Sequence, residues 1–105
     1  MIITTTMHIE NKPVQEYKGI VFGEVVAGSN FVKDFMSGIR DIVGGRSGSY
    51  EDSLMNARKA ALDEMSQRAS KLGANAIIGV SFQYSTVGAQ NGMLMITCNG
   101  TAVVV

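Results

Sequence analysis

The sequence lacks an excess of either charge, because nine basic side chains balance nine acidic ones among its 105 residues. Proteins that bind nucleic acid or an anionic membrane surface generally need a basic excess to neutralise phosphates. The sequence also has no apolar run long enough for a transmembrane helix, and its first residues carry no basic segment of the kind that opens a signal peptide. We therefore expect a cytoplasmic protein with no nucleic-acid partner and no membrane partner.

Cysteine and histidine are almost absent, since Cys98 and His8 are the single examples of each. One cysteine cannot form an internal disulfide. Structural zinc sites usually use four Cys or His ligands in spaced pairs, and the sequence contains neither CxxC nor HxxxH. We therefore expect no conventional zinc site built by one chain.

Familiar catalytic motifs are lacking as well. The sequence has no nucleophile elbow, no HExxH and no visible Ser-His-Asp set. Acid–base chemistry would require Asp41, Tyr50 and Glu51 to gather across an interface between copies. We predict that the protein is not an enzyme.

Hydrophobic residues, in contrast, are abundant: they make up 46% of the chain, while charged residues make up 17%. This composition excludes a disordered chain, and the length suits one domain that spans residues 1–105. The apolar residues continue around Met93–Ile96 on both sides of a predicted strand, and the chain ends in three valines. Two helices cannot cover so much apolar surface, so we expect a second copy of the chain to cover part of it.

Two segments show the spacing of apolar residues that is typical of amphipathic helices. The first begins near Asn30 and is stopped by Gly44 and Gly45. The second is predicted from about Tyr50 to Leu72, with Gly73 as its left-handed cap. Its predicted core stripe contains Leu54, Ala57 or Arg58, Ala61, Met65, Ala69 and Leu72, widened by Met55 and Leu62.

Four segments are predicted to be strands: 2–6, 14–27, 74–86 and the segment that begins at Met93. The second is apolar enough over Ile20–Val26 for burial on both faces. Its Gly19 and Gly23 share a face with Tyr17 and Val21, and they either admit a close neighbour or mark bulges. The predicted fold is α+β, with a small, mostly antiparallel sheet of about four strands backed by two helices in the order β-β-α-α-β-β.

Alternation along the last two strands predicts which side chains form the core. In the third strand the predicted core face carries Ala76, Ile78, Val80, Phe82 and Tyr84. In the fourth strand it carries Leu94, Ile96, Cys98, Gly100, Ala102 and Val104. Cys98 is therefore predicted to be a small buried hydrophobic residue, with a reactive or metal-binding thiol as the alternative.

The segment between the two predicted helices concentrates polar chemistry. Glycine-rich backbone before a helix N-terminus directs N–H groups outward, so this loop could hold a phosphate, a carboxylate or another small ligand. Its candidate residues are Gly44, Gly45, Arg46, Ser47, Ser49 and Glu51. The alternative is structural, with Arg46 bridging two subunits.

Three stretches carry a family resemblance: Ile39–Gly48 followed by Tyr50-Glu51, the junction Leu72–Ala76, and Gly100–Val103. They resemble the YbjQ-like family of uncharacterised bacterial proteins, over essentially the whole chain. The resemblance implies an α+β fold with two helices against a sheet, assembled as a ring that we expect to be a homopentamer. It also implies heavy-metal binding, without naming ligand residues or an activity.

A metal ion would have few soft ligands to choose from. The candidates are His8, Met93, Met95 and Cys98, and a ring would repeat each of them where subunits meet. Met93 and Met95 lie on one side of a strand, and thioethers suit copper(I). The alternative is that these methionines pack in the core or in an interface.

Overall fold

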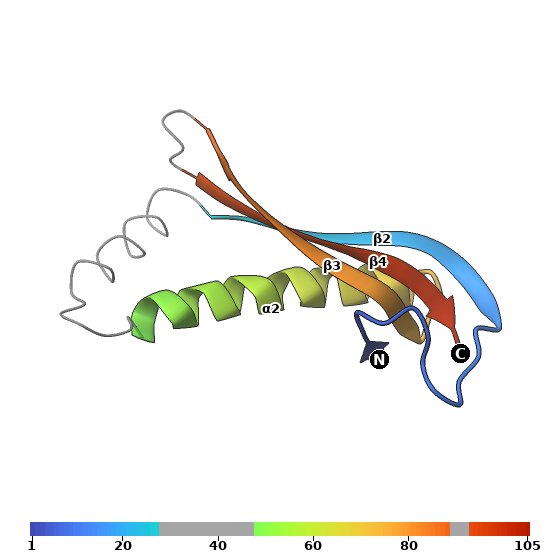
Figure 1. The fold of residues 1–105 in the computed structure, drawn as a ribbon. Coiled ribbons are helices and arrows are strands. Elements are labelled where there is room, and N and C mark those ends of the chain that lie inside the picture. The colour runs from blue at the N-terminus through green and yellow to red at the C-terminus, as the bar shows by residue number, and fades with distance from the viewer. Residues whose placement is uncertain (28–47, 89–92) are drawn as a thin grey trace.

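The computed structural model describes residues 1–27, 48–88 and 93–105. In chain order its elements are β1 (Ile2–Ile3), β2 (Glu16–Ala27), α2 (Gly48–Lys71), β3 (Ala76–Val87) and β4 (Met93–Val104). The four strands form one sheet in the order β1-β3-β4-β2, with β1 parallel to β3 and the other neighbours antiparallel. The long helix α2 lies against one face of this sheet (Figure 1). The predicted α+β class and four-stranded sheet are confirmed, whereas the first predicted helix lies outside the described residues.

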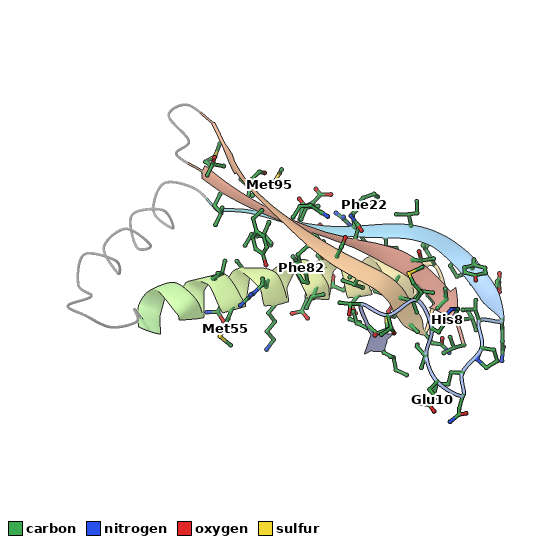
Figure 2. The ribbon with its side chains drawn as sticks, viewed as in Figure 1. His8, Glu10, Phe22, Met55, Phe82 and Met95 are labelled. Carbon is green, nitrogen blue, oxygen red and sulfur yellow. The ribbon has the colours of Figure 1, made fainter. Side chains whose placement is uncertain are left out.

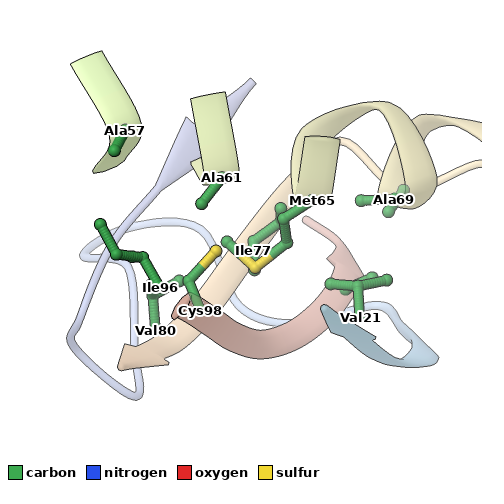
Figure 3. Close-up of a cluster of buried hydrophobic side chains, with 11 residues drawn as sticks. Val21, Ala57, Ala61, Met65, Ala69, Ile77, Val80, Ile96 and Cys98 are labelled. Atoms are coloured by element: carbon green, nitrogen blue, oxygen red, sulfur yellow. The ribbon is translucent and has the colours of Figure 1, made fainter. Parts of the chain in front are cut away.

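The contact between α2 and the sheet is made by small side chains at helical spacing. Ala57, Ala61, Met65 and Ala69 are buried and lie in one core cluster with residues of β2, β3 and β4 (Figure 3). Alanines on the inner face let the helix approach the sheet closely. The predicted stripe is confirmed at these positions, but Met55 and Leu72 are 58% and 45% exposed, so they lie outside it.

Gly73 ends α2 as predicted. It adopts a left-handed φ of 84°, which a residue without Cβ reaches at little cost. The Gly73 N–H donates to the Ser70 carbonyl at 3.0 Å, and the Ala74 N–H donates to the Ala69 carbonyl at 3.1 Å. This pair of bonds is a Schellman motif, and it satisfies two carbonyls at the helix end.

The two glycines of β2 have different roles. The register with β4 shifts between Tyr17 and Gly19, and Gly19 has a φ of 128°, so this glycine marks a bulge. Gly23 instead allows a close approach, since a Cβ built there would lie 1.9 Å from the Ala61 carbonyl oxygen. Both predicted alternatives are therefore realised. The bulge also corrects one prediction, because it moves Tyr17 away from the face of Val21 and leaves it 68% exposed.

A second irregularity reorients β3. Its register with β4 shifts between Ile78 and Ser81, and Gly79 has a φ of 62°. Consequently Ile77 and Val80 both lie in the cluster beneath α2, whereas Ile78 packs on the opposite face. The predicted unbroken alternation is wrong for the first residues of β3, because the extra residue at the bulge reverses the direction of the side chains that precede it.

The N-terminal arm continues along β3 beyond the two residues of β1. The Thr4 N–H donates to the Ile77 carbonyl at 2.9 Å, and the Gly79 N–H donates to the Thr6 carbonyl at 2.8 Å. The arm then turns, with Asn11 in a left-handed conformation, and returns toward β2. Residues of this arm cover one end of the sheet face that α2 leaves open. The cluster there contains Ala76, Ile78 and Val103, with Ile9, Val14 and Val105 packed against it.

The molecule is long and thin. Its Cα atoms span 51 × 30 × 17 Å and have a radius of gyration of 16.5 Å, whereas a compact domain of this length has about 13 Å. One helix and one sheet give two layers, so most of the second sheet face has no covering layer in the described part of the chain. The predicted two-sided burial of β2 is accordingly wrong for the single chain: Ile20, Phe22 and Val26 are 71%, 44% and 55% exposed.

Candidate functional site

The glycine-rich loop proposed as a ligand site falls largely outside the described residues. Gly44, Gly45, Arg46 and Ser47 are not described, while Ser49 and Glu51 belong to the first turn of α2. The predicted helix start at about Tyr50 is confirmed to within two residues, since α2 begins at Gly48. Anion binding by this loop stays a prediction.

Cys98 is buried beneath α2, as predicted (Figure 3). Its Sγ lies 3.0 Å from the position of a Cβ built on Gly23, and Met65 belongs to the same cluster. Burial raises the pKa of the Cys98 thiol above 9.0. Because the thiolate is the species that binds metals, the neutral buried thiol is poorly suited to be a ligand.

Among the other metal candidates, His8 lies far from Met93 and Met95, which are neighbours on one side of β4. His8 is exposed on the N-terminal arm, near one end of the sheet, and Met95 lies toward the other end (Figure 2). Met95 and Cys98 differ by an odd number of residues on β4, so their side chains point to opposite faces. Met93, the first residue of β4, packs beside Gly88, which follows the last residue of β3.

A single chain therefore does not bring His8, Cys98 and the two methionines of β4 together at one site. In residues 1–27, 48–88 and 93–105, no group of three or more His, Cys, Asp or Glu side chains could hold a metal ion. The remaining way to build a site from His8, Met93 and Met95 is to bring copies of the chain together.

The sheet face opposite α2 carries a hydrogen-bonded polar cluster that the sequence did not reveal. The Ser81 hydroxyl donates to Asn99 Oδ1 at 3.0 Å, and Gln83 Nε2 donates to Ser81 Oγ at 3.2 Å. Asn99 Nδ2 in turn donates to Gln83 Oε1 at 3.4 Å. The three side chains thus satisfy one another across β3 and β4. Alternation predicted their common side, but only the strand register brings them into contact.

Beside this cluster lies an apolar strip on β2. Phe22 is paired with Asn99, and Ile20 and Val26 point to the same face by the period of two. Figure 2 shows Phe22 on the side of the sheet that faces away from α2. We call this surface the open face; it consists of Ile20, Phe22, Glu24, Val26, Ser81, Gln83 and Asn99, so one charged side chain interrupts the apolar strip. It is mainly apolar along β2, apart from Glu24, and it is polar with internal hydrogen bonds along β3 and β4.

Arg68 of α2 reaches around the outer side of β2. Its Nη1 donates to the Phe22 carbonyl oxygen at 2.8 Å and lies 3.8 Å from Glu24 Oε1. Its Nη2 forms an ion pair with Glu64, one helical turn earlier. Sequence reasoning missed this contact, because the only local signal was the i, i+4 spacing of Glu64 and Arg68.

The described helix α2 is not apolar enough to cross a membrane, so the structure supplies no membrane-spanning helix among the residues it describes.

Comparisons with known proteins extend over the full length of the chain. A family model named YbjQ, with the description "Putative heavy-metal-binding", matches residues 1–105. A UPF0145 protein of Listeria ivanovii is 58% identical over 105 residues, which cover 100% of this chain and 96% of that protein. A UPF0145 protein of Clostridium botulinum is 56% identical over 103 residues, which cover 98% of this chain and 97% of that protein.

A solved structure shares the fold. It is a protein of unknown function from Pediococcus pentosaceus, assigned to the DUF74 family. It superposes with a TM-score of 0.65 at 17% identity, over 100% of this chain and 97% of that one. At this identity the similarity supports the architecture and carries no information on ligands.

Proposed function

We propose a function for this chain from the fact that it belongs to the YbjQ family. In this proposal it is a non-catalytic, self-associating cytoplasmic protein, and it binds heavy-metal ions at the interfaces between its copies. Assembly as a ring, expected to be a pentamer with two helices backing each sheet, is part of this proposal. The family description supports the metal, and the open face supports the assembly.

One observation carries the proposal: Ile20, Phe22 and Val26 are exposed on the same face of β2, with Glu24 between Phe22 and Val26, and the described residues form two layers that leave this face open. Fully burying one such side chain contributes about 1.5–3 kcal/mol, so three of them represent a substantial driving force for association. The desolvation penalty for burying the polar half of the open face is reduced, because Ser81, Gln83 and Asn99 already form three hydrogen bonds with one another.

Metal binding by the assembly follows from the separation of the soft ligands in one chain. Met95 is paired with Val26, so its thioether lies at the end of the apolar strip. Association through the open face would bring Met95 of several copies toward a shared interface, and sulfur ligands of this kind favour copper(I) over zinc. Cys98 does not take part in this arrangement, since it is buried beneath α2.

Copper(I) titration tests the proposal. The untagged wild-type protein, Met95→Leu and Met55→Leu are titrated separately at the same protein concentration. Met55 is the control, because it is an exposed methionine on α2, away from the open face. We expect stoichiometric binding by the wild type and by Met55→Leu, and weakened binding by Met95→Leu. Failure of the wild-type protein to bind copper(I) or zinc at all would refute the metal part of the proposal.

A second candidate function is anion binding at the loop formed by Gly44, Gly45, Arg46, Ser47 and Ser49. It is favoured by the start of α2 at Gly48, which directly follows Ser47 and places a helix N-terminus, including Ser49, at the end of the loop. A thermal-shift screen with phosphate compounds tests it. Stabilisation that Arg46→Ala abolishes, with the oligomer intact, would support this function, whereas loss of the oligomer would assign Arg46 to assembly.

A further inference from the structure

The outer side of β2 is a long strand edge. In the part of the chain that the structure describes, β2 is the last strand of the sheet and pairs only with β4 over its 12 residues. Because the Phe22 carbonyl accepts a bond from the outer side, the N–H of Phe22 and those of Ile20 and Glu24 also point outward. Exposed, apolar edges of this kind tend to pair with a strand of another chain.

Arg68 occupies the middle of this edge. Its guanidinium donates to the Phe22 carbonyl at 2.8 Å and is held between the carboxylates of Glu24 and Glu64. Glu64 orients it from the same helix, and Glu24 lies two residues beyond Phe22 on the strand. A planar, charged donor held on two sides therefore takes the place of the amide that an incoming strand would supply.

An incoming strand would need the Phe22 carbonyl as an acceptor and the adjacent N–H groups as donors. To use these groups, the incoming strand would have to displace the Arg68 guanidinium from the Phe22 carbonyl and from the carboxylates of Glu24 and Glu64. The charges of these three side chains would then lie beside the newly formed strand pair. Arg68 thus opposes strand pairing along β2 at Phe22, the residue in the middle of the apolar strip. The side chains of Ile20, Phe22 and Val26 remain accessible on the open face.

We infer that Arg68 closes the outer edge of β2 to strand pairing, so that copies of the chain associate through the side chains of the open face and not by joining β2 to β2. The second half of this inference rests on the proposed self-association. The first half does not, since a closed edge would equally protect a monomer from edge-to-edge aggregation.

Hydrogen exchange of the outward amides of Ile20, Phe22 and Glu24 tests the inference, measured at low and high protein concentration. In Arg68→Ala we expect exchange at these amides to slow by roughly tenfold or more as concentration rises, with increased thioflavin T fluorescence. Wild-type protein should show no such dependence. Lys71→Ala is the matched control, because it removes the same charge from an exposed position in the last turn of α2.

Arg68→Met provides a second variant that keeps the aliphatic stem and loses the guanidinium, in case Arg68→Ala perturbs the helix. The inference is overturned if both variants exchange like the wild type at every concentration, or if the wild-type amides are already protected by an intermolecular strand. A wild-type protein that stays monomeric would refute the proposed self-association, while the exchange of the Arg68 variants would still decide whether this residue closes the edge.

Discussion

Gly23 of β2 lies directly against the backbone of Ala61 in α2, where the two layers approach closely. A Cβ on Gly23 would lie 1.9 Å from the Ala61 carbonyl oxygen and 3.0 Å from the Cys98 sulfur. The nearest obstacle is backbone, which cannot rotate away as a side chain can. The distance between helix and sheet, and hence the burial of Cys98, therefore depends on glycine at this position.

Gly23→Ala is expected to destabilise the fold by about 1–3 kcal/mol, because α2 must move away from the sheet to admit the methyl group. Urea denaturation followed by circular dichroism measures this change. Gln67→Ala, at an exposed position on α2, is the control and should change stability by less than about 0.5 kcal/mol. Equal stability of Gly23→Ala and wild type would show that the two layers are farther apart than described.

The two methionines of α2 provide a matched pair. Met65 is fully buried in the core, whereas Met55 is 58% exposed. Met65→Ala should cost about 2–5 kcal/mol through lost burial and a residual cavity. Met55→Ala should cost less than about 0.5 kcal/mol. Similar costs for both substitutions, measured by urea denaturation, would contradict the described orientation of the helix.

The burial of Cys98 should make the free energy of unfolding depend on pH in the alkaline range. Burial raises the pKa of its thiol above the ordinary value of 9.0, so the folded state retains a proton that the unfolded state loses. Stability from this group is complete below pH 9.0 and declines as pH rises further. Denaturation midpoints measured across this range should fall more steeply for the wild type than for Cys98→Ala. Identical slopes would show that the thiol is not buried.

The sequence predicted the parts of the fold that depend on local patterns. The helix that ends at Gly73, the inner stripe Ala57–Ala69 and the core position of Cys98 follow from spacing and from glycine's left-handed conformation. The errors in side-chain direction along β2 and β3 have a common cause, since bulges at Gly19 and Gly79 insert one residue and reverse the side chains before them. A period of two carries no information on where such an insertion falls.

The candidate site was less predictable for a different reason. The cluster of Ser81, Gln83 and Asn99 depends on the pairing of β3 with β4, and the contact between Arg68 and Phe22 joins residues 46 positions apart. Neither relationship has a local signature. The sequence nevertheless indicated an apolar surface too large for one copy, and the exposed strip on β2 gives that surface a location.

Phe22→Ser should weaken self-association while leaving the circular dichroism spectrum unchanged, because it removes the central side chain of the apolar strip. Tyr84→Ser is the control: Tyr84 is an aromatic residue of comparable exposure, 48% against 44%, that stacks on Phe82 on the α2 side. Sedimentation velocity over a range of concentrations measures both. Equal dissociation of the two variants would place the interface elsewhere.

The central claim is that one copy of this chain leaves an apolar sheet face for another copy to cover. The mass of the wild-type protein in dilute solution, determined by light scattering after size exclusion, tests it most directly. We predict a mass that corresponds to two or more copies of the 11.2 kDa chain, with five copies as the expected number. A single species of 11.2 kDa that persists as concentration increases would contradict the claim.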